Sequence, residues 1–135
     1  MVSVRLLTDV GDDRGSSFCV PETSLAFLEA ARDVHLATIK PGRVRGNHYH
    51  ARKREILLVR FADSWTFHWD EGDPPQASRR EYSGEGAVVV EVPPLCSHAV
   101  ENTGSRDLLI VSVSDEAYDP DHPDVVTRVL SRPTA

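Results

Sequence analysis

Four side chains that can bind a divalent metal are grouped in two short stretches. His48 and His50 are one residue apart, Glu55 follows five positions later, and His98 lies in PPLCSHAVEN. On a β-strand, residues i and i+2 point to the same side, so the two imidazoles face one way. The polar run 51–54 can supply a turn or bulge that corrects the parity of Glu55. Three imidazoles and a carboxylate suit one ion of zinc, iron, nickel or manganese.

Short β-strands are the main elements expected to position these side chains. Apolar patterning and turn residues predict strands over 2–7, 18–20, 34–39, 55–61, 64–69, 87–92, 97–102, 107–113 and 125–130. A hairpin loop is expected over 70–78 and a loose tail over 131–135. The one helical pattern covers 22–33, with Leu25 and Leu28 on its apolar stripe and Thr23 or Ser24 as cap. We expect a single all-β domain over 1–135, a sandwich or jelly-roll barrel with one short N-terminal helix.

Three of the expected strands are apolar on both faces. In 55–61, 87–92 and 107–113, apolar side chains occupy both parities. A strand of this kind is covered on both sides, whereas a lone barrel presents a polar outside. A second subunit is the simplest cover, so a homodimer is predicted.

Composition excludes several classes of protein. The chain has 135 residues, 40% hydrophobic and 27% charged, with a net charge of −6 that argues against a nucleic-acid binder. It has no apolar run of about 18 residues and no signal peptide, so no membrane contact and a cytoplasmic location are expected. Cys19 and Cys96 form no Cys-x-x-Cys and are expected to be free thiols.

Positive charge is concentrated around the proposed metal ligands. Residues 40–60 contain one acid, Glu55, and seven cations, namely Lys40, Arg43, Arg45, Arg52, Lys53, Arg54 and Arg60. A local cationic field in an acidic protein suits a small anionic substrate such as a nucleotide sugar, with Arg43, Arg45 and Lys53 as its candidate contacts. A solvated basic loop in which no single arginine matters explains the same run equally well.

The spacing of these residues resembles the two cupin motifs. Gly42-x5-His48-x-His50-x4-Glu55 is similar to the first, and Gly86-x6-Pro93-x4-His98-x3-Asn102 to the second. The resemblance implies a double-stranded β-helix in which the three histidines and the glutamate bind one metal. Ala62 and Leu95 stand at turn positions where the motifs commonly have glycine.

A narrower resemblance covers most of the chain. RGNHYH, the PP-x3-H-x2-EN pattern and DEAYDPDHPD are similar to the C-terminal cupin domain of CapF-like capsular-polysaccharide enzymes. DDRGSSF resembles the opening of the wider nucleotide-sugar epimerase and ketoisomerase cupins. The resemblance implies epimerisation or isomerisation of a 4-keto nucleotide sugar with the metal as Lewis acid.

Other uses of the same barrel are open. An iron site can activate dioxygen, which would make the protein a cupin dioxygenase for a small molecule. A barrel that only binds a small ligand, a metal that is purely structural and a site without metal are further alternatives.

The proton-transfer and binding groups for an isomerase are candidates by position. Tyr49, His68 and Tyr82 are the candidate acid and base, although Tyr49 has opposite parity to the neighbouring histidines. Cys96 shares the parity of His98 and could form a cavity wall, in contact with the substrate, or a fifth metal ligand. Trp65 and Trp69 share one face of their strand and suit either a core or interface, the more frequent use, or a stacking surface for a base or sugar. His35 and His122 are expected to be structural or exposed.

Overall fold

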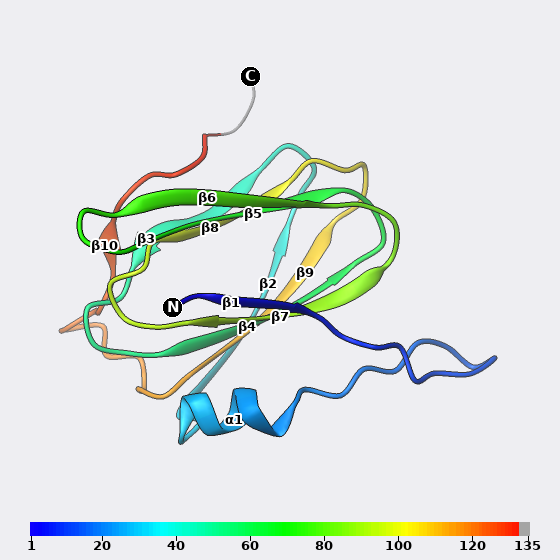
Figure 1. Cartoon of the computed structure of the whole chain (residues 1–135), viewed down its shortest axis with the longest axis horizontal. Coiled ribbons are helices and arrows are strands. Elements are labelled where there is room, and N and C mark those ends of the chain that lie inside the picture. The colour runs from blue at the N-terminus through cyan, green and yellow to red at the C-terminus, as the bar shows by residue number, and fades with distance from the viewer. Residues whose placement is uncertain (133–135) are drawn as a thin grey trace.

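Two antiparallel sheets of five strands face each other in the computed structural model, which describes residues 1–132 (Figure 1). Sheet one has the spatial order β1 (Ser3–Leu6), β7 (Gly86–Val92), β4 (Glu55–Phe61), β9 (Leu108–Ser114) and β2 (Asp33–Ile39). Sheet two has the order β10 (Val126–Thr127), β3 (Val44–Tyr49), β8 (His98–Asn102), β5 (Trp65–Glu71) and β6 (Gln76–Tyr82). Neighbours in a sheet are mostly distant in sequence, as in a jelly roll, so the expected all-β fold is confirmed.

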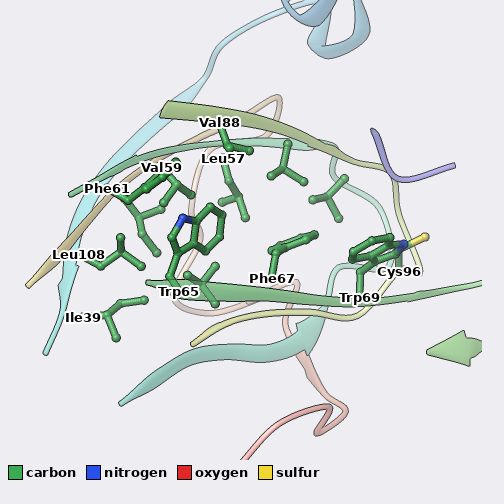
Figure 2. Packing of buried hydrophobic residues seen from close by; sticks show 14 residues of the cluster. Ile39, Leu57, Val59, Phe61, Trp65, Phe67, Trp69, Val88, Cys96 and Leu108 are labelled. Carbon is green, nitrogen blue, oxygen red and sulfur yellow. The ribbon is translucent and has the colours of Figure 1, made fainter. Parts of the chain in front are cut away.

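The apolar core lies between the sheets and is made by strands whose alternate residues point inward. On β4, every second residue from Leu57 to Phe61 is buried there. On β5, Trp65, Phe67 and Trp69 are buried in the same way, and Figure 2 shows them packed between the two layers. Burial of each large side chain contributes about 2–3 kcal/mol of transfer free energy. This core fills one part of the barrel and leaves the histidine-bearing end open.

The chain itself covers part of the outer face of sheet one. Helix α1 (Glu22–Leu28) packs against β4 and β7, where Leu28 is buried (Figure 1). Phe18 and Val20 line an apolar depression over the same sheet. The apolar outer residues of β4 and β7 therefore need no second subunit as cover. Along β2 and β9 the outer face stays open, with Val34, Leu36 and Leu109 at 60%, 67% and 41% exposure.

The helix is shorter than the apolar stripe predicts. It ends at Leu28 because Glu29 has φ 66° and ψ −53°, a γ-turn conformation that cannot continue the helix, so the prediction of helix over residues 29–33 was wrong. Leu25 is 54% exposed and does not belong to a buried stripe. Ser24 makes no cap and instead donates its hydroxyl hydrogen to Glu91, at 2.8 Å.

Three other segments differ from the sequence prediction. The strand expected over 18–20 is wrong, because only an isolated bridge between Asp9 and Phe18 forms there. The hairpin loop expected over 70–78 is confined to its middle, because β6 begins at Gln76 and pairs with β5. Strand β6 is almost wholly exposed and polar, so it lacks the alternation that would have marked it. The last strand covers only Val126–Thr127, and residues 133–135 of the expected tail lie outside the described part. No helical segment within residues 1–132 has the length and apolarity of a membrane span.

Candidate metal centre and substrate cavity

Three histidines meet where β3 and β8 lie side by side in sheet two. His48 is on β3, His50 directly follows that strand, and His98 begins β8. His48 and His98 are register partners, and one ring nitrogen from each of the three imidazoles lies within 4.8 Å of the others. The ring centroids are 5.0–5.6 Å apart. The sequence prediction that these histidines converge is confirmed.

A bulge in β3 sets the direction of the first two histidines. The register with β8 shifts between Gly46 and His48, and the intervening Asn47 is left-handed with φ 57°. Because the bulge precedes His48, the i and i+2 relation with His50 is kept. On the facing loop, Leu95 also has a positive φ of 71°, and its N–H donates to the carbonyl oxygen of His50 at 2.7 Å. Leu95 therefore adopts a conformation that glycine takes at lower cost.

Glu55 completes the cluster from the opposite sheet. It starts β4, and the polar residues 51–54 make the turn that returns its carboxylate to the histidines. Its Oε1 lies 3.0 Å from Nε2 of His98, and the Ser112 hydroxyl donates to Oε2 at 2.8 Å. Its Oε2 is 3.6 Å from Nε2 of His50, too long for a hydrogen bond.

Burial and neighbouring charge shift two pKa values in the cluster. Burial alone raises the pKa of Glu55, but the imidazoles of His50 and His98 hold it well below its usual value. Burial lowers the pKa of His48 to about 4, and positive charge on His98 and His50 contributes in the same direction. At neutral pH the cluster thus offers a carboxylate and a neutral imidazole, the protonation states that bind metal.

One buried atom indicates that the cluster suits a cation. His50 is 4% exposed, and its Nε2 has no hydrogen-bond partner. An unpartnered buried nitrogen is costly unless a ligand accepts its lone pair. Two ligands that are each about 2.0–2.2 Å from one ion lie about 3 Å or slightly more apart, close to the 3.0 Å between Glu55 and His98. The three imidazoles, with the Glu55 carboxylate beside those of His98 and His50, are donors of the types that a divalent ion takes.

A cavity of about 650 Å³ leads from the surface to this cluster. Its wall is apolar at Leu57, Val100 and Ile110, and its lining also includes Arg45 and Lys53. Two of the three predicted anion-binding cations therefore lie at the cavity, whereas Arg43 is exposed outside the lining. A cavity of this size accommodates a small organic molecule.

The three candidate proton-transfer residues lie away from the cavity. The ring of Tyr49 is covered by the Arg128 guanidinium, 4.4 Å away, and His68 is hydrogen-bonded to Glu101 at 2.8 Å. Tyr82 stacks on a core tryptophan, with ring centroids 4.7 Å apart. Tyr49 and His68 have the wrong parity to reach the barrel interior, and Tyr82 belongs to the core end. In this structure none of them faces the histidine cluster.

Three predicted substrate contacts are core residues instead. Trp65 is fully buried, Trp69 is 9% exposed, and Cys96 is 8% exposed within the same apolar cluster. Neither tryptophan lines the cavity, and each is stacked on a neighbouring aromatic ring. The structure therefore supports their core interpretation and not a stacking role.

Several residues at the cavity were missed in the sequence. Asp33 and His35 of β2, Ser112 of β9 and Tyr118 all contribute to the lining. His35 was expected to be structural or exposed because it has no ligand near it in sequence. It is indeed exposed, but it also lies at the cavity. Its strand pairs with β9, where Ser112, 77 residues downstream, is the register partner of His35. His35 has the same strand parity as the core residue Ile39, and this parity indicates that His35 faces the interior of the barrel.

A double-sheet jelly roll with a His-x-His pair, a glutamate and a third histidine in its interior is a cupin. The model of the polysaccharide biosynthesis C-terminal domain matches residues 11–126. The chain belongs to this family.

Similar proteins are larger or more distant. A UDP-2-acetamido-2,6-beta-L-arabino-hexul-4-ose reductase from Pseudomonas aeruginosa is 31% identical over 94 residues, which cover 64% of this chain and 23% of the relative. CapF, a capsular polysaccharide assembling protein from Staphylococcus aureus, superposes with a TM-score of 0.66 at 27% identity, over 92% of this chain and 34% of CapF. This chain thus spans a minor part of both.

A shorter neighbour shows the same fold. The 3,4-ketoisomerase QdtA from Thermoanaerobacterium thermosaccharolyticum, crystallised as a mutant with TDP-4-keto-6-deoxyglucose, has a TM-score of 0.67 at 16% identity. The match covers 93% of this chain and 86% of QdtA. The barrel can therefore form almost the whole of a protein chain.

Proposed function

We propose that this chain is a metal-dependent isomerase or epimerase of a keto sugar nucleotide. The observation that carries the proposal is the buried, unpartnered Nε2 of His50, which lies among two further imidazoles at the inner end of the cavity. Family membership in polysaccharide biosynthesis supports a sugar substrate. A keto sugar nucleotide in the QdtA complex and a hexulose reductase among the relatives support the keto sugar class.

The ligand set would be His48, His50, Glu55 and His98. A divalent ion, when bound there, supplies Lewis acidity towards a ketone, which makes the adjacent C–H more acidic. The apolar wall at Leu57, Val100 and Ile110 limits water beside the reacting carbon. This wall is matched to a sugar ring, whose faces carry C–H groups.

The cationic rim accounts for recognition of the diphosphate. Arg45 and Lys53 lie on different elements, one on β3 and one in the turn before β4, and both line the cavity. Arg45 is held by a 2.8 Å hydrogen bond from its Nε to the carbonyl oxygen of Thr38, which leaves its terminal nitrogens available. Two cations at one rim match the charge of a nucleoside diphosphate.

Proton transfer requires a group other than the metal ligands, and His35 is the best placed. It is exposed within the cavity lining, and among residues 1–132 it is the one lining imidazole outside the ligand set. Its strand partner Ser112 donates a hydrogen bond to Glu55. One residue, Ser112, therefore links the strand position of His35 to the cluster. Imidazole is the side chain most often used as a general base.

Solvent exchange tests the proposal. The metal-loaded protein is incubated with a TDP-4-keto-6-deoxy sugar in deuterated buffer while dissolved oxygen is recorded. We expect deuterium to enter the sugar beside the ketone without oxygen uptake. His35→Gln should lower this exchange at least about 100-fold with the metal content unchanged. Oxygen uptake that depends on iron would instead indicate a dioxygenase, and ligand-dependent thermal shifts without either reaction would indicate a binding protein.

Elemental analysis tests the metal site separately. His48→Ala and His98→Ala should each lose stoichiometric metal while keeping the β-sheet circular dichroism of the parent. His122→Ala is the matched control, because His122 is exposed and paired with Asp119 in a surface loop. Metal retained in both ligand variants would refute the assignment.

A further inference from the structure

The segment that follows β9 returns to the metal cluster and runs along it. Strand β10 pairs with β3, so that Val126 lies opposite Tyr49 and Thr127 opposite His48. Sheet two is thereby extended beside the strand that carries the first histidine. The residues before and after β10 make the contacts that matter for the site.

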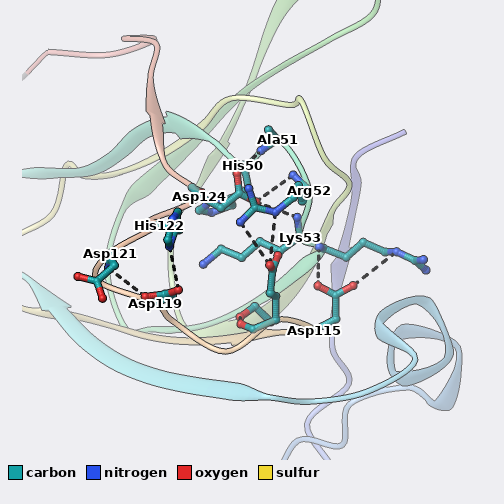
Figure 3. Close-up of polar contacts among 12 residues, drawn as sticks. His50, Ala51, Arg52, Lys53, Asp115, Asp119, Asp121, His122 and Asp124 are labelled. Carbon is teal, nitrogen blue, oxygen red and sulfur yellow. Dashed lines mark hydrogen bonds and ion pairs between the residues drawn. The ribbon is translucent and has the colours of Figure 1, made fainter.

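Asp124 holds the turn between two of the candidate ligands. Its carboxylate accepts hydrogen bonds from three consecutive backbone N–H groups, those of Ala51 at 2.7 Å, Arg52 at 2.9 Å and Lys53 at 3.0 Å (Figure 3). Asp124 is 8% exposed. Consecutive N–H groups that converge on one anion form a nest, which fixes the backbone strongly. This nest spans the interval between His50 and the start of β4.

The backbone of Asp124 also controls the imidazole of His50. Its carbonyl oxygen lies 2.6 Å from Nδ1 of His50. A carbonyl can only accept, so Nδ1 carries the hydrogen, and a neutral ring then has its lone pair on Nε2. That nitrogen is the buried, unpartnered atom in the cluster. Asp124 thus both orients the ring and selects the tautomer that a metal needs.

Asn47 attaches the same segment to the bulge before His48. Its Nδ2 donates to the carbonyl oxygen of Ser131 at 2.8 Å, and its Oδ1 accepts from the N–H groups of Leu130 and Ser131. The left-handed residue of the bulge is therefore fixed by a segment 84 positions away. Both histidines of the pair are anchored through the C-terminal segment.

We propose that Asp124 is a positioning residue of the metal centre, which keeps His50 as the Nδ1–H tautomer and clamps the turn that follows it. The inference rests on the proposed metal site but makes a separate claim, because the tautomer exists in the metal-free protein. Asp124 is not among the residues that line the cavity, so it would act through His50 and not on the substrate.

The decisive measurement is the tautomer of His50 in the metal-free protein, read from two-bond ¹H–¹⁵N correlations of selectively labelled histidine. We expect Nδ1–H with an unprotonated Nε2 in the wild type. An Nε2–H tautomer in the wild type would overturn the proposal, whatever the variants do. If the wild type shows Nδ1–H and binds no zinc, the proposed metal function fails while the positioning role stands.

Asp124→Asn tests the clamp, with Asp121→Asn as the matched control on the same loop. The amide group cannot accept all three hydrogen bonds, because its NH₂ faces an N–H donor. Asp121 is exposed, so its change leaves the nest intact. Loss of the side-chain clamp lets the backbone carbonyl of residue 124 move away from Nδ1 of His50. We therefore expect zinc affinity to fall about 10–100-fold in Asp124→Asn, together with a mixture of His50 tautomers, and to stay within about twofold in Asp121→Asn. Equal affinity and an unchanged tautomer in a folded Asp124→Asn would overturn the proposal.

Discussion

Gly46→Ala should separate the two strands that carry His48 and His98. Gly46 has φ +107° and lies opposite Ala99, immediately before the bulge. A Cβ at Gly46 would be 2.5 Å from the carbonyl oxygen of His98 and 3.0 Å from Cα of Ala99. Both neighbours are backbone atoms in a paired strand, so neither can rotate away. The strands have to move apart by several tenths of an ångström, at the position where the two histidines meet.

The expected cost has two parts. A non-glycine residue at this φ costs about 1–3 kcal/mol in backbone strain. Overpacking against a strand that cannot retreat adds about 1–3 kcal/mol. We therefore expect Gly46→Ala to lower the free energy of unfolding by about 2–6 kcal/mol, which a domain of ordinary stability survives at room temperature.

Urea unfolding, followed by tryptophan fluorescence, measures the loss. Gly84→Ala is the matched control, because Gly84 also has a positive φ, +77°, but no atom lies within 4 Å of its Cβ position. It should show only the strain, about 1–2 kcal/mol. Zinc affinity should fall in Gly46→Ala and stay unchanged in Gly84→Ala. Equal unfolding free energies for the two variants, within about 0.5 kcal/mol, would refute the steric argument.

Two further predictions concern pH and assembly. Because burial holds the pKa of His48 at about 4, below the 6.5 of the unfolded chain, the unfolded state binds more protons between these values and the metal-free protein loses stability as pH falls. From about pH 7 to pH 5 the free energy of unfolding, measured with urea, should fall by about 1–2 kcal/mol through His48, and this contribution should be absent in His48→Gln. The same pH dependence in both proteins would contradict the prediction. Light scattering after gel filtration should give twice the chain mass, as expected for a homodimer. Leu36→Arg, on the exposed face of β2, should give a monomer. Val10→Arg, at an equally exposed position elsewhere, should leave the dimer intact. A wild-type monomer at micromolar concentration would remove the dimer from consideration.

Part of the histidine cluster was predictable because strand parity is local. His48 and His50 follow from a two-residue period, and the polar run before Glu55 indicates the turn that the structure contains. The same parity predicts that Tyr49 points away from the cluster. Alternating Trp65, Phe67 and Trp69 likewise identify one core face of β5.

The rest of the site depends on pairings between distant segments. Asp124 lies 74 residues from the histidine whose tautomer it controls, and nothing near either residue indicates the contact. His35 reaches the cavity only because β2 pairs with β9. The exposed strand β6 forms through backbone pairing with β5, so its side chains carry no pattern. Local periodicity reveals which face of a strand is inside, but not which other strand will lie beside it.

The departures from ordinary local structure are concentrated around the histidines. Asn47 and Leu95 are two of the three non-glycine residues with positive φ in residues 1–132, and each is hydrogen-bonded to a segment that supports the cluster. The buried imidazole of His48 adds a further cost, because burial and charge on the two neighbouring histidines both disfavour a proton on it. Costs of this kind persist where the surrounding structure over-determines the geometry. Here the rigid aromatic core at one end of the barrel and the C-terminal segment at the other supply that constraint, so the cluster is held ready for a ligand before one binds. A site of this kind should lose binding affinity when an anchor is removed well before the barrel loses its fold.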